Sequence, residues 1–240
     1  MRRTDARKAV PTVSVQENLM WVRDRIRALA GAANRGPEAV RLIAVSKTVS
    51  IDVAHEAYAA GQRAFGENRV LELEEKAPRL PADCEWHMIG HLQKNKVRSI
   101  VRHAAWIHSV DSVALLQRID GIAAEEGRCP RVLVQVNISG EATKSGVTPG
   151  EARPIVAEAR NCRNLVCAGL MTMAPFDSEP ADLHRFFGSL RLLRDELESA
   201  CGCALPELSM GMSGDYEIAV AEGATMVRIG TAIFGAREGV

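Results

Sequence analysis

The chain has 240 residues, and its 30 lysines and arginines balance 30 aspartates and glutamates, so the formal net charge is zero. This balance excludes a nucleic-acid binder that works through an overall basic field, while leaving room for a local phosphate pocket. No apolar run reaches the roughly 18–20 residues of a membrane span, and no apolar segment of a signal peptide follows the basic start. We therefore expect a cytoplasmic protein without membrane or nucleic-acid partners, whose six cysteines are reduced.

Hydrophobic spacing predicts short apolar strands that alternate with helices along most of the chain. Residues 1–13 are charged and aperiodic, so we expect a loose arm there, followed by a helix that begins at Ser14. Strands are predicted at 41–47, 64–66, 86–90, 106–110, 131–138, 165–173, 208–212 and 226–234. The helices between them are predicted at 50–61, 68–77, 94–102, 112–126, 149–161, 180–200 and 215–222.

Strands that alternate with helices form parallel sheets. Eight such units in about 250 residues are typical of a closed (β/α)₈ TIM barrel, which we predict as one domain over residues 14–240. The alternative is an open, doubly wound sheet. No G-x-G-x-x-G motif follows the first strand, which argues against a dinucleotide site.

Lys47 directly follows an apolar strand, so it lies where a parallel barrel has its active site. A lysine that is desolvated there has a lowered pKa, and its neutral amine can form a Schiff base with a carbonyl group. The alternative is a strand-end lysine that extends to solvent. The position alone does not decide between the two.

Two glycine-containing turns follow the last two predicted strands, at 211–214 and 230–231. Backbone amides and hydroxyl groups in such turns favour an anion, and this fold often binds phosphate after its last two strands. Together with Lys47 they indicate a ligand with an aldehyde and a phosphate, which is pyridoxal 5'-phosphate. Arg228, in an apolar strand, then suits a contact to the pyridine nitrogen; the alternative is a structural salt bridge.

Several motifs occur in a fixed order: AVSK at 44–47, FGEN at 65–68, WHMIGHLQKNK at 86–96, KSG at 144–146, GLMTM at 169–173, LSMGMS at 208–213 and VRIGTAIFG at 227–235. With them the chain, over about residues 41–235, resembles the pyridoxal phosphate homeostasis proteins, which are related to the N-terminal domain of alanine racemase. The resemblance implies a barrel like that domain and a Schiff base on Lys47. It implies cofactor contacts from Lys47, Asn68, His87, Met212, Ser213, Arg228, Gly230 and Thr231.

Within these contacts, the resemblance implies that Ser213, Gly230 and Thr231 bind the phosphate, with the Met212 backbone nearby. Arg228 would face the ring nitrogen, Asn68 the ring, and His87 the edge of the pocket. The function implied is that of a monomeric carrier that stores and delivers the cofactor in vitamin B6 homeostasis and affects amino-acid metabolism indirectly. Apo-enzymes that depend on the cofactor are the candidate recipients, and no catalytic reaction is implied.

Three other functions compete with this one. A racemase needs a second base, and Tyr58 and Tyr216 are the only tyrosines. An aldolase acting on a sugar phosphate would use Lys47 and the phosphate turns but leaves Arg228 unexplained. Zinc ligation by Cys84, His87 and His91 lacks a fourth ligand, so we expect no metal.

Overall fold

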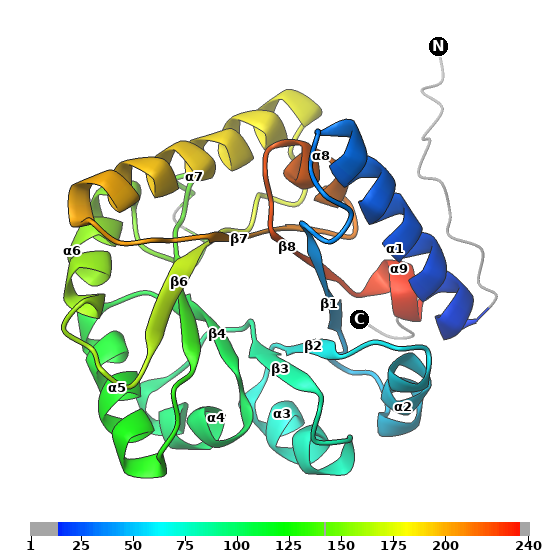
Figure 1. Ribbon diagram of the computed structural model, residues 1–240, viewed down its shortest axis with the longest axis horizontal. Coiled ribbons are helices and arrows are strands. Elements are labelled where there is room, and N and C mark those ends of the chain that lie inside the picture. The colour runs from blue at the N-terminus through cyan, green and yellow to red at the C-terminus, as the bar shows by residue number, and fades with distance from the viewer. Residues whose placement is uncertain (1–13, 142, 236–240) are drawn as a thin grey trace.

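The computed structural model describes residues 14–141 and 143–235, and eight parallel strands close into a barrel in chain order (Figure 1). The helices lie around the barrel, which confirms the predicted TIM-barrel fold. The strands are β1 (Arg41–Val45), β2 (Ala64–Glu67), β3 (Glu85–Met88), β4 (Trp106–Val110), β5 (Arg131–Gln135), β6 (Val166–Met171), β7 (Glu207–Met212) and β8 (Met226–Ile229). The predicted arm at 1–13 lies outside the described residues.

Some of the helices begin at a serine whose side chain caps the first turn, whereas others, such as α3, α4 and α8, have no side-chain cap. Ser14, Ser50 and Ser112 each accept a backbone N–H of the following turn, as their positions predict. The helices are α1 (Val15–Ala32), α2 (Ile51–Ala59), α3 (Val70–Lys76), α4 (Val97–His103), α5 (Val113–Glu126), α6 (Pro149–Ala159), α7 (Pro180–Cys201), α8 (Tyr216–Ala221) and α9 (Thr231–Phe234). Two 3₁₀ turns, η1 (Ala77–Arg79) and η2 (Lys94–Lys96), precede β3 and α4.

The apolar residues form two separate cores because side chains alternate between the two faces of each strand. The larger core lies between the outer face of the barrel and the helices. The smaller one fills the barrel interior and consists of Ile43, Ala64, Trp106, Leu133, Ala168, Met171 and Met226. The interior is thus packed, and a ligand site belongs at a rim.

Two predicted elements differ from the structure. The apolar segment at 226–234 is one strand in the prediction, but β8 ends at Ile229 and Thr231–Phe234 is a helical turn. Gly230 turns the backbone (φ −114°, ψ −73°), and the carbonyl of Ile233 accepts a hydrogen bond from Asn18 on α1 (2.9 Å). The predicted helix at 94–102 starts as a 3₁₀ turn.

The described residues contain no helix long and apolar enough to cross a membrane. All six cysteines are free thiols. Within the same part of the chain no group of histidine, cysteine and acidic side chains is arranged to hold a metal ion.

Candidate functional site

The predicted site residues other than His87 lie on, or just after, four neighbouring strands of the barrel. Lys47 follows β1 after one intervening residue, and Asn68 follows β2 directly. Ser213 follows β7, and Gly230 and Thr231 follow β8. In the closed barrel, β7 pairs with β8, β8 with β1, and β1 with β2. The parallel arrangement therefore brings these residues together at the C-terminal mouth.

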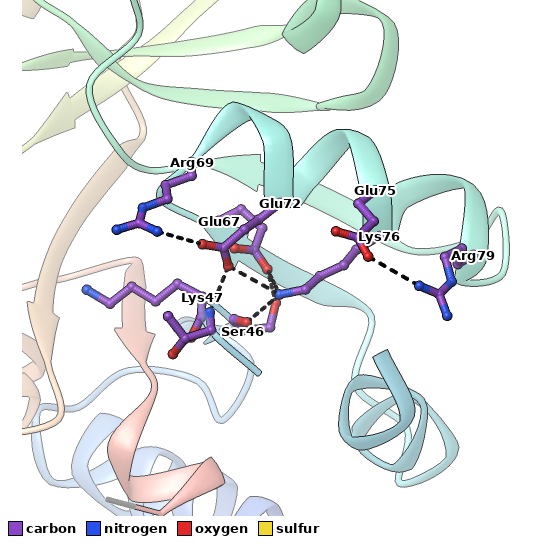
Figure 2. Close-up of polar contacts among 9 residues, drawn as sticks. Ser46, Lys47, Glu67, Arg69, Glu72, Glu75, Lys76 and Arg79 are labelled. Atoms are coloured by element: carbon purple, nitrogen blue, oxygen red, sulfur yellow. Dashed lines mark hydrogen bonds and ion pairs between the residues drawn. The ribbon is translucent and has the colours of Figure 1, made fainter. Parts of the chain in front are cut away.

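Lys47 continues the inward-facing side of β1. It lies four residues after Ile43, which belongs to the core inside the barrel, so strand alternation places both on the interior side. The side chain is half-buried. Figure 2 shows it directed away from the charged group around Lys76, which lies on the other side of the backbone. The amine is therefore presented on the mouth side of the turn.

A buried group of polar side chains holds the backbone on both sides of Lys47 (Figure 2). Lys76 Nζ on α3 donates to the carbonyl oxygen of Ser46 (2.7 Å) and to Glu67 Oε1 on β2 (2.8 Å). The Ser46 hydroxyl donates to the same Glu67 oxygen (2.7 Å). On the other side, the Thr48 N–H donates to Glu72 Oε2 (2.7 Å), and Thr48 has a positive φ of 63°. The turn that carries Lys47 is thus fixed from α3.

The electrostatics of this group depend on Lys76. Burial raises the pKa of Glu67, while the contacts with Lys76 and Ser46 oppose the rise. Burial also disfavours the charge on Glu72, but the Thr48 N–H and Lys76 outweigh it and lower the pKa of Glu72. Glu67 Oε2 is buried with no hydrogen-bond partner among the described residues. Removing one partner of such a buried pair costs more than removing both.

The turn after β7 has a geometry that requires glycine at one position. Gly211 has φ +94°, and a Cβ there would lie 2.6 Å from Ala219 Cβ. The Met212 N–H donates to Asp215 Oδ1 (2.5 Å), which anchors the turn to the start of α8. Ser213 is half-buried, and a Cβ at Gly214 would face open space. The turn therefore offers a hydroxyl and backbone at an open surface, while the Met212 amide is already engaged.

Arg228 is buried inside the barrel without a carboxylate partner. Its side chain is 3% exposed; Nη1 donates to Ser209 Oγ (2.6 Å) and Nη2 to the carbonyl oxygen of Thr172 (2.9 Å). Burial lowers its pKa to about 10, which leaves it charged at neutral pH. No ion pair joins it to any carboxylate in the part of the chain that the structure describes. The predicted salt-bridge alternative is therefore not observed, and the charged guanidinium sits beside the mouth.

Asn68 and His87 occupy different levels of the barrel. Asn68 is half-buried and shares the interior side of β2 with Gly66, where a Cβ would lie 3.0 Å from Ile43 Cγ2. His87 is fully buried, and its ring nitrogens contact His108 (2.9 Å) and Glu85 (3.1 Å). Glu85 is the first residue of β3, so His87 is turned toward the opposite end of the barrel from the mouth. His87 is connected to Arg228 through hydrogen bonds of His108 and Ser209.

The residues at the mouth fit pyridoxal phosphate by their chemistry. The cofactor needs an amine for its aldehyde, an anion site for its phosphate and a partner for its ring nitrogen. Lys47 supplies the amine, and the turns with Ser213 and Thr231 supply hydroxyl and amide donors at an open surface. Arg228 supplies a permanent positive charge. Next to these groups, the apolar side chains of Ile43 and Ile89 lie close to Gly66.

Sequence reasoning missed the group around Lys76. One signal for it exists: Leu73 and Lys76 are three residues apart on α3, and both are buried. A lysine on the apolar face of a helix needs a buried acidic partner, and Glu67 is the last residue of β2. His108 was missed because it lies within an apolar strand, and Ser209 belongs to the 208–213 motif but was given no role there.

The fold and the mouth define a barrel of the alanine racemase N-terminal class. The sequence model of the family "Alanine racemase, N-terminal domain" matches residues 18–238. A pyridoxal phosphate homeostasis protein of Pseudomonas aeruginosa is 46% identical over 228 residues, covering 94% of this chain and 96% of the relative. Another, of Aquifex aeolicus, is 42% identical over 223 residues, covering 92% and 98%. The chain belongs to the pyridoxal phosphate homeostasis family.

Solved structures agree with this assignment. PipY of Synechococcus elongatus, solved with pyridoxal phosphate bound, is 41% identical with a TM-score of 0.83, and the match covers 92% of this chain and all of PipY. The alanine racemase of Clostridium difficile is 16% identical with a TM-score of 0.71, and the match covers 93% of this chain and 58% of the racemase. The racemase shares the barrel fold alone.

Proposed function

We propose that this protein binds pyridoxal 5'-phosphate at the barrel mouth, holds it on Lys47, and acts in storage and delivery of the cofactor in the cytoplasm. The observation that carries the proposal is the placement of Lys47, Ser213, Thr231 and Arg228 on neighbouring strands at one rim. The names of the relatives and the cofactor-bound PipY structure support it. We further propose that the protein acts as a monomer and that its recipients are apo-enzymes that use this cofactor.

Each part of the mouth has a distinct task in this proposal. Lys47 would supply the amine that holds the aldehyde group of the cofactor. The group around Lys76 fixes the backbone on both sides of Lys47, so that the amine stays directed toward the mouth. Ser213, Gly230 and Thr231 hold the phosphate. Arg228 remains protonated and donates to the ring nitrogen, which keeps that nitrogen unprotonated.

An unprotonated ring nitrogen favours a cofactor carrier over a catalytic enzyme, because the ring is then a weaker electron sink. The tyrosines give no second base for a racemase. Tyr58 donates to Asp83 (2.7 Å), a residue close to the start of β3 and away from the mouth. Tyr216 is buried, and burial raises its pKa to about 12. Neither tyrosine is poised to accept a proton from a substrate at the mouth, so we propose a carrier without catalytic activity.

Absorbance titration of the purified protein with pyridoxal phosphate tests this function. We expect a visible band with one equivalent bound in the wild type and no such band in Lys47→Ala. Lys144→Ala is the matched control, because Lys144 lies in the loop after β5 and should leave the band unchanged. Absence of the band in the wild type refutes the proposal. Exchange of the α-proton of L- or D-alanine at an enzymatic rate would instead favour a racemase.

A further inference from the structure

A line of hydrogen-bonded side chains crosses the barrel interior beneath the mouth. Arg228 Nη1 on β8 donates to Ser209 Oγ on β7 (2.6 Å), which lies 2.9 Å from His108 Nδ1 on β4. His108 Nε2 lies 2.9 Å from His87 Nδ1 on β3, and His87 Nε2 lies 3.1 Å from Glu85 Oε1. These five residues form what we call the interior polar line. All of it except Glu85 is at most 3% exposed.

When both histidine rings are neutral, the chemistry of the two ends fixes the direction of every hydrogen bond. Arg228 can only donate and the Glu85 carboxylate can only accept, so Ser209 Oγ accepts from Arg228 and donates its single proton to His108 Nδ1. His108 then carries its proton on Nε2 and donates to His87 Nδ1. His87 in turn carries its proton on Nε2 and donates to Glu85, which as a carboxylate can only accept. One arrangement of protons satisfies the whole line.

The charges around His87 leave its ring neutral. Burial lowers its pKa, Glu85 and Glu207 oppose this, and Arg41 on β1 adds to it. Glu85 is ionised, because its contacts with His87 and Arg41 outweigh burial and lower its pKa to about 2. Arg41 Nη1 lies 2.6 Å from Glu85 Oε1, so the acidic end of the line is itself paired.

His108 is neutral for a stronger reason. Burial lowers its pKa well below the usual value, and the positive charges of His87 when protonated, Arg228 and Arg41 add to the effect. Asp215 is the carboxylate that acts on Arg228 from the mouth side. A second positive charge within the line is thus disfavoured, and the line connects a cation at the mouth to a paired carboxylate at the other end.

We propose that Ser209, His108, His87 and Glu85 are positioning residues for Arg228, and that this one-way line fixes its guanidinium as a donor and so sets the protonation of the cofactor's ring nitrogen. Two of the five N–H groups of Arg228 are held, by Ser209 and by the Thr172 carbonyl. Aligned hydrogen bonds polarise one another. The Glu85 carboxylate at one end of the line therefore strengthens the hydrogen bond from Arg228 to Ser209 at the other end. This inference rests on the proposed function.

The direction of the line is tested in the cofactor-free protein by ¹⁵N NMR of histidine side chains. In the wild type at neutral pH we expect two neutral rings with the proton on Nε2, because burial opposes their charging. In Glu85→Gln, whose side-chain amide can donate as well as accept, both rings lose their fixed tautomer. Ser109→Ala is the matched control, since the Ser109 hydroxyl is fully buried on β4 with no partner among the described residues. Rings that are charged, or protonated on Nδ1, would overturn the direction.

The effect on the cofactor is tested by the pH dependence of the visible band. We expect Ser209→Ala, His108→Gln and Glu85→Gln each to shift the pH midpoint of the band by about half a unit or more. Each change weakens the hydrogen bonds that hold the charged Arg228 side chain next to the cofactor ring. Ser109→Ala should match the wild type. Unchanged midpoints in all three variants would overturn the coupling. If the wild type forms no band, the proposed function fails, and the cofactor's part of this inference fails with it; the NMR spectrum still decides the line itself.

Discussion

Lys76 Nζ lies 2.8 Å from the buried Glu67 Oε1, and the same ammonium donates to the carbonyl oxygen of the residue before Lys47. Helix α3 therefore reaches through the outer core to the backbone of the first strand. The orientation of Lys47 depends on an ion pair whose members come from β2 and α3. A change to this pair should affect both the stability of the fold and the reactivity of Lys47.

Lys76→Met should lower the free energy of unfolding by about 3–5 kcal/mol, because it leaves the Glu67 carboxylate buried without its cation. Urea denaturation of the cofactor-free protein measures the loss. Lys94→Met is the matched control; Lys94 is exposed on η2, and a surface change of this kind costs within about 0.5 kcal/mol. Equal stability of the two variants would show that the pair contributes nothing.

The double variant Glu67→Leu with Lys76→Met separates stability from positioning. Replacing both partners of a buried ion pair by apolar side chains is often neutral, so we expect most of the lost stability to return. The Ser46 carbonyl and hydroxyl still lose their partners, so Lys47 should react with pyridoxal phosphate more slowly than in the wild type. A wild-type rate in the double variant would contradict the positioning role.

Arg228→Ala should alter the ring of the bound cofactor more than it alters phosphate binding. Ser209 Oγ and the Thr172 carbonyl lose a charged donor, and the ring nitrogen becomes free to take a proton. We expect the pH midpoint of the visible band to move by about one unit, with competition by inorganic phosphate unchanged within about twofold. A tenfold loss of phosphate competition with an unmoved midpoint would place Arg228 at the phosphate instead.

Stability should fall as the pH is lowered, in two stages. The folded-state pKa values of His87 and His108 lie below the ordinary value, so the unfolded chain binds more protons below about pH 6.5. The slope there cannot exceed about 2.7 kcal/mol per pH unit, which is the limit for two protons. Glu85 adds a second stage, because its stabilising charge is lost as the pH falls from about 4.5 toward about 2.

Urea denaturation between pH 5 and 8 measures the first stage. The double variant His87→Gln with His108→Gln should flatten the profile in this range. If this double variant keeps the wild-type slope, the buried histidines are not its source.

Phosphate recognition should survive the loss of the amine. Lys47→Ala should still be stabilised against heat by pyridoxal phosphate, since a ligand that binds only the folded state raises the melting temperature. Pyridoxal, which lacks the phosphate, should have no such effect on this variant. Ser213→Ala with Thr231→Ala in the wild-type background should weaken binding by roughly tenfold, or about 1.4 kcal/mol. Equal shifts by the two ligands would count against a phosphate site in these turns.

The barrel was predictable because its strands are short apolar runs that alternate regularly with helices. The residues at the mouth were predictable because position after a strand is a property of the sequence. The last helical turn was not, since the apolar residues after Gly230 have the composition of a strand and only the bend at that glycine separates them.

The supporting residues could not be predicted because their partners are distant in sequence. Ser209 and His108 are 101 residues apart, and each sits among apolar neighbours that give no hint of a hydrogen bond. Glu67 and Lys76 are closer, but their pairing depends on how α3 packs against β2. The sequence pattern places each residue on a strand or a helix. Which of these residues form hydrogen-bonded pairs is decided only when the barrel closes.

Reductive trapping identifies the lysine that holds the cofactor. The protein is mixed with pyridoxal phosphate, reduced with borohydride and digested, and the modified peptide is mapped by mass spectrometry. We expect one modified lysine, Lys47, at near-complete occupancy, with Lys76 and Lys144 unmodified. Labelling spread over several lysines, or concentrated on a lysine other than Lys47, would contradict this expectation.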